Sequence, residues 1–131
     1  MNSPLDATVR ADGTSTRILL SGRIDRDGDE TMTRAWQEAR EVGSGEVVLD
    51  FGATDYINST GIALIVRLLA EARRDGRPVR ASGLSEHYRE IFRITRLSDF
   101  ITLEDGAAAT TVDGPAQPAS DVAAQQVGGS R

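Results

Sequence analysis

The sequence predicts a single α/β domain in which helices pack on a mixed, mostly parallel β-sheet. Short apolar segments typical of strands alternate with longer segments whose apolar residues recur at helical spacing. The apolar run at 47–49 does not alternate, which indicates a strand buried on both faces. A length of 131 residues, 39% of them hydrophobic, suits one globular domain. The predicted order is β-β-α-β-α-β-α-β.

Two short strands, at 7–10 and 17–21, are predicted to begin the domain. Asp12-Gly13 between them is a hairpin-type turn signal, and Ser21-Gly22 is expected to end the second strand.

The first helix is predicted to begin in the acidic segment 27–30 and to run to about Val42. Asp27, with Glu30 three residues later, has the spacing of a capping box. The segment 43–45 contains two glycines and ends the helix. The apolar stripe expected to face the sheet consists of Met32, Ala35, Trp36 and Ala39.

The rest of the domain alternates strand and helix. A strand at 46–51 is followed by a loop at 52–57, and the second helix begins at Ser59 or Thr60 and runs to Asp75. A strand at 78–82 and a third helix from 86 to about 94, capped by Ser85, come next. A short strand at 100–103 is predicted to complete the sheet.

The second helix has a predicted core face and a charged solvent face. Leu64 and Leu68 lie beside the core stripe, where they either widen the core or expose an apolar patch for a partner. The stripe itself is Ile62, Ile65, Val66, Leu69 and Ala72, and the solvent face carries Arg67, Arg73 and Arg74.

Charge and composition exclude several classes of function. Fifteen basic residues, all Arg, stand against twenty acidic ones, and a net charge of −5 makes nucleic acid and anionic membranes poor partners. The absence of Cys and Lys excludes disulfides, thiolate nucleophiles and Schiff-base chemistry. The first residues have no signal-peptide pattern, and the run at 62–66 is too short to span a bilayer, so we expect a cytoplasmic protein.

No constellation typical of an enzyme occurs in the sequence. The single histidine, His87, stands among polar residues and is predicted to be exposed. The acidic cluster at 25–30 fits a solvated helix start better than a metal site. We therefore expect no catalysis, no metal and no cofactor.

The composition changes after residue 105. Residues 106–131 contain no aromatic residue, Leu or Ile, and such a segment buries too little apolar surface to offset its ordering entropy. The predicted domain therefore covers residues 1–105, and a disordered tail rich in Ala, Gly, Pro and Gln covers 106–131.

The most informative segment is the start of the second helix, Asn58-Ser59-Thr60-Gly61. Asn, Ser and Thr are preferred helix caps, which is the structural interpretation. A hydroxyl at a helix N-terminus also suits phosphorylation, because the unpaired amides there favour an anion. Gly61 costs the helix about 1 kcal/mol relative to Ala, so its missing Cβ must permit close approach by another backbone or by a partner.

The residues 50–61, 22–25 and 83–97 resemble the STAS domain of bacterial anti-sigma factor antagonists. The resemblance covers about 8–103, and the Asn-Ser-Thr-Gly-Ile run after a strand and loop is its most specific motif. It implies a protein that binds an anti-sigma factor and thereby frees a sigma factor to direct transcription.

The resemblance also implies how the interaction is regulated. In this family the anti-sigma factor is commonly a serine kinase that phosphorylates the antagonist and ejects it, and a PP2C-type phosphatase reverses the modification. The matching acceptor is Ser59, with Thr60 as second candidate, and Asp25 matches an acidic residue expected near it. The implied partner-binding surface comprises Asp25, Asn58, Ser59, Thr60, Gly61, Ile62 and Leu64.

One residue departs from the family pattern. Asn58 stands where the family usually has Asp, which either slows phosphorylation or removes a charge that would repel the phosphate. The alternative function is a constitutive STAS scaffold or an accessory subunit, for example of a transporter or a signalling complex.

Overall fold

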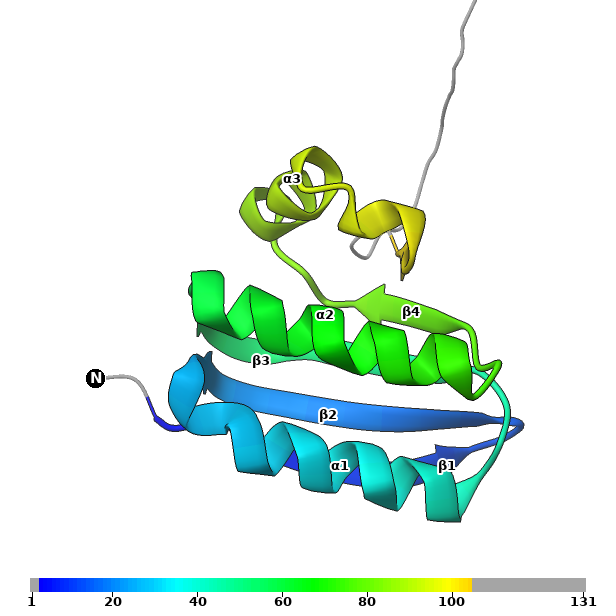
Figure 1. Ribbon diagram of the computed structural model, residues 1–131. Helices are drawn as coiled ribbons and strands as arrows, with labels where there is room; N and C mark the ends of the chain where they lie inside the picture. Colours follow the sequence, from blue (N-terminus) through cyan, green and yellow to red (C-terminus); the bar gives the residue numbers. More distant parts are fainter. Residues whose placement is uncertain (1–2, 105–131) are drawn as a thin grey trace, which may run out of the picture.

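Five strands form one sheet in the order β1-β2-β3-β4-β5 in the computed structural model, which describes residues 3–104 (Figure 1). β1 is antiparallel to β2, and the remaining neighbours are parallel. The strands are β1 (Asp6–Asp12), β2 (Ser15–Ile24), β3 (Val47–Ile57), β4 (Val79–Ser82) and β5 (Thr102–Leu103). The helices are α1 (Asp29–Val42), α2 (Ser59–Arg74) and α3 (Glu86–Ile94), with 3-10 turns η1 (Arg26–Gly28) and η2 (Leu97–Asp99). The predicted fold class and element order are confirmed, and the predicted tail lies outside the described residues.

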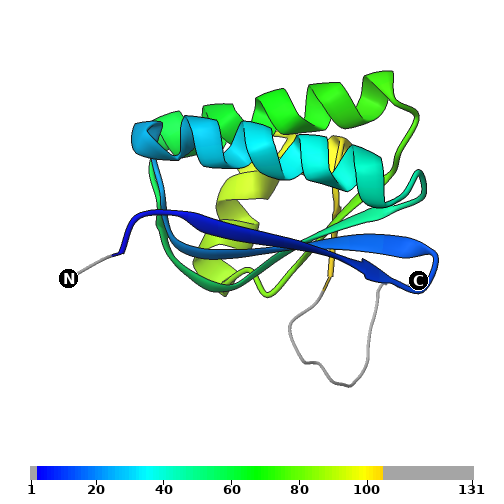
Figure 2. The same ribbon diagram turned by 90° about the horizontal axis from the view of Figure 1, so that it is seen from below.

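α1 and α2 run side by side on one face of the sheet (Figure 2). Along β2 every second residue is buried beneath them, including Ile18, Leu20 and Ile24. The residues Val47–Leu49 are all buried, as predicted for a strand covered on both faces, and β3 is a central strand between β2 and β4. The core therefore sits between these two helices and the sheet.

The first hairpin is longer than predicted. Asp12 pairs with Ser15, so the loop residues are Gly13 and Thr14 rather than Asp12 and Gly13. Gly13 has a φ of +68°, as the first position of a type II′ turn requires. The predicted end of β2 at Ser21-Gly22 is wrong, because Gly22 marks an irregularity in the pairing with β3 and β2 continues to Ile24.

The predicted loop at 52–57 is also wrong, because β3 continues through it. Its second half pairs with the end of β2, where Gly22 faces Thr54 and Ile24 faces Ile57. The Thr54 hydroxyl donates to the Leu20 carbonyl at 3.2 Å. Long-range pairing with β2 thus keeps this polar segment extended.

The capping box proposed for α1 does not form. The Asp25 carboxylate instead accepts a hydrogen bond from the Asp27 amide at 3.1 Å and caps the short turn η1. α1 begins at Asp29, within the predicted segment 27–30, after a buried Gly28 that offers no side-chain cap. The predicted buried stripe of α1 is confirmed.

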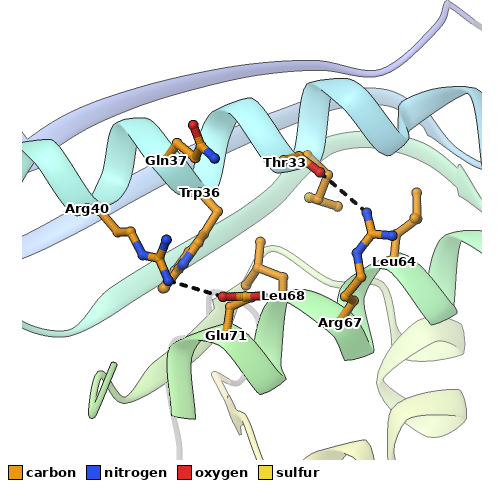
Figure 3. Close-up of a pocket in the computed structure, with 9 residues that line it drawn as sticks. Thr33, Trp36, Gln37, Arg40, Leu64, Arg67, Leu68 and Glu71 are labelled. Carbon is orange, nitrogen blue, oxygen red and sulfur yellow. Dashed lines mark hydrogen bonds and ion pairs between the residues drawn. The ribbon is translucent and has the colours of Figure 1, made fainter. Parts of the chain in front are cut away.

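The buried face of α2 is rotated relative to the prediction. Leu64 and Leu68 are buried and point toward α1 (Figure 3), which resolves their role in favour of the core. Val66, predicted to face the sheet, is 44% exposed, and Ile62 is half-buried. The rotation follows from α2 packing against α1 as well as against the sheet.

The remaining predicted elements are close to those observed. α3 and its Ser85 cap are confirmed, with the Ser85 hydroxyl accepting from the Tyr88 amide at 3.2 Å. β4 begins one residue after Pro78, and β5 is shorter than predicted because Phe100 follows the turn η2.

Arg77 is a buried cation that joins three elements. Its guanidinium donates to the carbonyls of Gly45 (2.6 Å) and Ala39 (2.9 Å) and to the Thr16 hydroxyl (3.0 Å). It also lies 5.7 Å from the ring centroid of Trp36. Burial lowers the pKa of the Arg77 guanidinium.

Candidate functional site

The candidate site lies at the carboxyl ends of β2 and β3, where α2 begins. The Asn58 amide donates to the Ile24 carbonyl at 3.2 Å, so the start of α2 and the turn after β2 adjoin. The carboxyl ends of parallel strands are where α/β folds commonly place binding sites. Two of the three segments that carry the family resemblance, 22–25 and 50–61, therefore meet here through strand pairing and this hydrogen bond.

Asn58 caps α2, as the sequence predicts. Its side-chain oxygen accepts from the Gly61 amide at 2.8 Å, and its carbonyl accepts from the Ile62 amide at 2.9 Å. Ser59 and Thr60 follow in the first turn, and both are exposed. Within residues 3–104 neither hydroxyl makes a hydrogen bond, so both are accessible to a partner or a modifying enzyme.

Gly61 lies against the backbone of β2. A Cβ at this position would lie 2.0 Å from the Ile24 oxygen and 2.7 Å from its carbonyl carbon. Of the two explanations for the missing Cβ, close approach of another backbone is therefore sufficient. Gly61 is buried, and we call its contact and that of Asn58 with Ile24 the α2–β2 seam.

Asp25 follows the seam directly but does not hydrogen-bond Ser59. Its carboxylate accepts from Arg23 Nε at 2.7 Å and from the Asp27 amide, and its side chain is 19% exposed. The turn that carries Asp25 adjoins the start of α2, and Arg23 neutralises the Asp25 carboxylate within its own segment.

The other predicted site residues are less accessible. Leu64 is 6% exposed and belongs to the core, and half-buried Ile62 packs against it. Sequence analysis missed Tyr56, which is 44% exposed and pairs with Arg23 across β2 and β3. The sequence did offer one indication of Tyr56: it is an aromatic residue two positions before the predicted helix cap Asn58. The segment was interpreted as a loop, so this indication was not used. The neighbouring Ile57 amide donates to the Tyr88 hydroxyl at 3.0 Å, which fixes the end of β3.

A small groove of about 150 Å³ lies between α1 and α2 (Figure 3), and Ser59 does not line it. Its polar groups pair across the helices, with Arg40 bound to Glu71 at 3.1 Å and Arg67 to Thr33 at 3.4 Å. Arg40 also binds Asp75 at 2.7 Å and lowers the pKa of that carboxyl. The groove is therefore a contact between two helices whose charges are already matched.

The other chemistry considered from the sequence can also be located. His87 is exposed, as predicted, and its ring contacts Tyr88. Between residues 3 and 104 no three His, Cys, Asp or Glu side chains gather as metal ligands would. In the same part of the chain no helix has the length and apolar character needed to cross a membrane.

Solved structures of similar fold include an anti-sigma factor antagonist from Mycobacterium paratuberculosis, with 19% identity and a TM-score of 0.61 over 79% of this chain and 89% of that one. The anti-sigma factor antagonist SpoIIAA in its unphosphorylated form is also similar, with 15% identity and a TM-score of 0.55 over 70% of this chain and 83% of that one. The phosphorylated form of SpoIIAA from Bacillus has 16% identity and a TM-score of 0.56 over 75% of this chain and 90% of that one. At these identities the likeness shows the fold.

A search of curated proteins finds no match to the sequence. The family model described as "Mlab, STAS domain" matches residues 7–104, which is nearly all of the described structure. The chain therefore belongs to the STAS domain family.

Proposed function

We propose that this protein is an anti-sigma factor antagonist whose binding to a kinase-type anti-sigma factor is switched off by phosphorylation of Ser59. The observation that carries the proposal is an exposed serine hydroxyl, without a hydrogen bond in residues 3–104, on the rigid and capped start of α2. Solved structures of the same fold include an antagonist in unphosphorylated and phosphorylated forms. The protein is a regulator rather than an enzyme in this proposal, and it acts in the cytoplasm.

The phosphate would act on binding more than on folding. A phosphoserine carries about −1.5 to −2 charges at neutral pH. In the free protein it stays in water beside the unpaired first-turn amides, which favour an anion. In an interface centred on Ser59 it would have to be desolvated, and each ~1.4 kcal/mol of that cost weakens binding about tenfold. Repulsion by Asp25 adds less, because Arg23 already neutralises that carboxylate.

The second candidate function is constitutive binding as a STAS scaffold or accessory subunit. Asn58 favours it, because an amide caps α2 through its oxygen without supplying the carboxylate that the family usually has beside the acceptor serine. In that case Ser59 would contact a partner but carry no phosphate. The two candidates therefore differ in one measurable property, the modification of Ser59.

Two experiments test the proposal. Intact mass and peptide mapping across 50–67, on protein from its native cell under growth and under stress, should show phosphate on Ser59 and identify Thr60 as minor or unmodified. Absence of phosphate under both conditions would favour the constitutive candidate.

Binding to the anti-sigma factor should then be measured for Ser59→Ala, Ser59→Asp and Ser44→Asp. Ser44 is exposed in the loop before β3, at the opposite end of the sheet from Ser59, and controls for added charge. We expect Ser59→Asp to weaken binding at least about tenfold, a loss of ~1.4 kcal/mol, while the other two bind normally. Equal binding by Ser59→Ala and Ser59→Asp would refute the switch.

A further inference from the structure

A second concavity, about 520 Å³ in volume, opens beside the C-terminal half of α2. Its walls come from α2, from the start of β4 and from the segment around η2, and they are mainly apolar: Val66, Leu69, Ala70, Val79, Leu97 and Phe100. Ser59 lies at the other end of α2 and does not line it. We call this concavity the α2–η2 groove.

The groove holds large apolar side chains that the core does not cover. Val66 is 44% exposed and Phe100 is 56% exposed. Both face the same concavity, although they are 34 positions apart in the sequence. A concave, mainly apolar site of about 300–1,000 Å³ with few polar groups is the usual form of a small-molecule site.

Of the two arginines at the groove, only Arg73 has hydrogen-bond donors that no group in residues 3–104 uses. Arg73 makes no hydrogen bond or ion pair in the described part of the chain, and its guanidinium carbon lies 5.6 Å from the ring centroid of Phe100. The other groove arginine, Arg77, uses all three of its nitrogens on internal acceptors. The groove carboxylate, Asp99, is paired with Arg96 at 2.9 Å. The unmatched charge at this apolar surface is therefore positive.

We propose that the α2–η2 groove binds an aliphatic monocarboxylate, with the alkyl chain against the apolar walls and the carboxylate on Arg73. The alkyl chain would cover Val66 and Phe100, which water now contacts. A carboxylate complements Arg73, whose hydrogen-bond donors are unused, and a guanidinium binds a carboxylate with two parallel hydrogen bonds. The site is independent of the Ser59 surface and of the function proposed for it.

The test is a titration of the full chain with dodecanoate, below its micelle concentration, followed by amide NMR. Saturable shifts should centre on α2 from Val66 onward and on η2. Shortening the ligand should weaken binding by about fourfold per methylene removed. Dodecanol, which lacks the charge, should bind more weakly than dodecanoate.

Three variants separate specific binding from adsorption. Ala70→Leu keeps a good helix former at an exposed position and fills the groove, so it should abolish the shifts while the rest of the spectrum is unchanged. Arg73→Gln should weaken dodecanoate binding about fivefold. Arg74→Gln is the matched control, because Arg74 lies in the same helical turn, pairs with Glu71 at 3.1 Å and does not line the groove.

Several results would overturn the proposal. These are the absence of saturable shifts, shifts that persist in Ala70→Leu, equal binding of dodecanol and dodecanoate, or equal affinities of the two arginine variants. Groove signals that change with protein concentration in the absence of ligand would instead identify a second copy as the occupant. Nuclear Overhauser contacts between the groove and residues 105–131 would identify the chain's own C-terminal segment.

Discussion

Replacing Gly61 by Ala tests the α2–β2 seam. In an isolated helix this change is stabilising by about 1 kcal/mol, because Gly loses more backbone entropy than Ala on folding. In this fold the new methyl group would lie 2.0 Å from the Ile24 oxygen and 3.1 Å from Ile24 Cγ2. Helix propensity therefore predicts that Gly61→Ala raises the free energy of unfolding, whereas packing against Ile24 predicts that it lowers it.

The structure indicates that packing wins. The methyl group needs at least 3.0 Å from the Ile24 oxygen, so the start of α2 must retreat from β2 by about 1 Å. The obstacle is backbone and cannot rotate away. Overpacking of a rigid site costs about 1–3 kcal/mol or more, and the retreat also strains the Asn58–Ile24 hydrogen bond, worth about 1 kcal/mol. When the gain of about 1 kcal/mol in helix propensity is subtracted from these costs, we expect the free energy of unfolding to fall by about 2 kcal/mol. This corresponds to a decrease of roughly 10 °C in melting temperature.

Urea unfolding followed by the fluorescence of the single tryptophan, buried Trp36, measures this loss. Gly28→Ala is the matched control. A Cβ there would have the Leu5 side chain as its nearest neighbour, at 2.8 Å from Cδ2 and 3.3 Å from Cβ. None of its three nearest atoms is backbone, so we expect a smaller loss, of about 1 kcal/mol. Stability of Gly61→Ala equal to or above that of the native chain would refute the steric reasoning.

Substitutions at three further positions probe the same structure. Asn58→Ala should cost about 1 kcal/mol of unfolding free energy by removing the cap, whereas Asn58→Asp should match the native chain; equal stability of all three would contradict the cap. Arg77→Met should lower stability by about 3 kcal/mol, because buried acceptors lose their donor, and a loss below about 1 kcal/mol would mean that water replaces it. Arg40 lowers the pKa of Asp75, so this pair stabilises the fold above pH 3.8 and the contribution disappears as the pH falls through the lowered pKa. Arg40→Gln should therefore be less stable than the native chain at neutral pH and equally stable in strong acid, and a difference that persists in acid would contradict the ion pair.

The sequence predicted the helices better than the strand ends, for a physical reason. The signals that begin and end a helix are local. The caps Ser85 and Asn58, and the end of α1 near Val42, could therefore be predicted from a few neighbouring residues. The second half of β3 is polar and contains glycine, and only its pairing with β2 makes it a strand. The rotation of α2 that exposes Val66 likewise depends on where α1 packs, which periodicity in one helix does not contain.

The candidate site was predictable in its residues but not in its contacts. The Asn58–Gly61 run identified the cap, and the position of Gly61 implied a close neighbour, but two neighbours remained possible until Ile24 was located. Arg23, which neutralises Asp25, and the exposed Tyr56 follow from the pairing of β2 with β3 and had no local signal. Leu64 was included because its face was ambiguous, and the structure assigns it to the core.

The α2–β2 seam has a consequence for how this surface conveys information. One carbonyl, that of Ile24, accepts from the Asn58 amide just before α2 and also leaves no room for a side chain at Gly61, so two contacts hold the start of α2 against β2. A chemical group added to the Ser59 hydroxyl would change the charge that the surface displays and leave its shape as it was. A partner could detect the difference only by touching Ser59 itself. Phosphorylation would then alter the local electrostatic potential at Ser59 and cause no conformational change in distant parts of the domain.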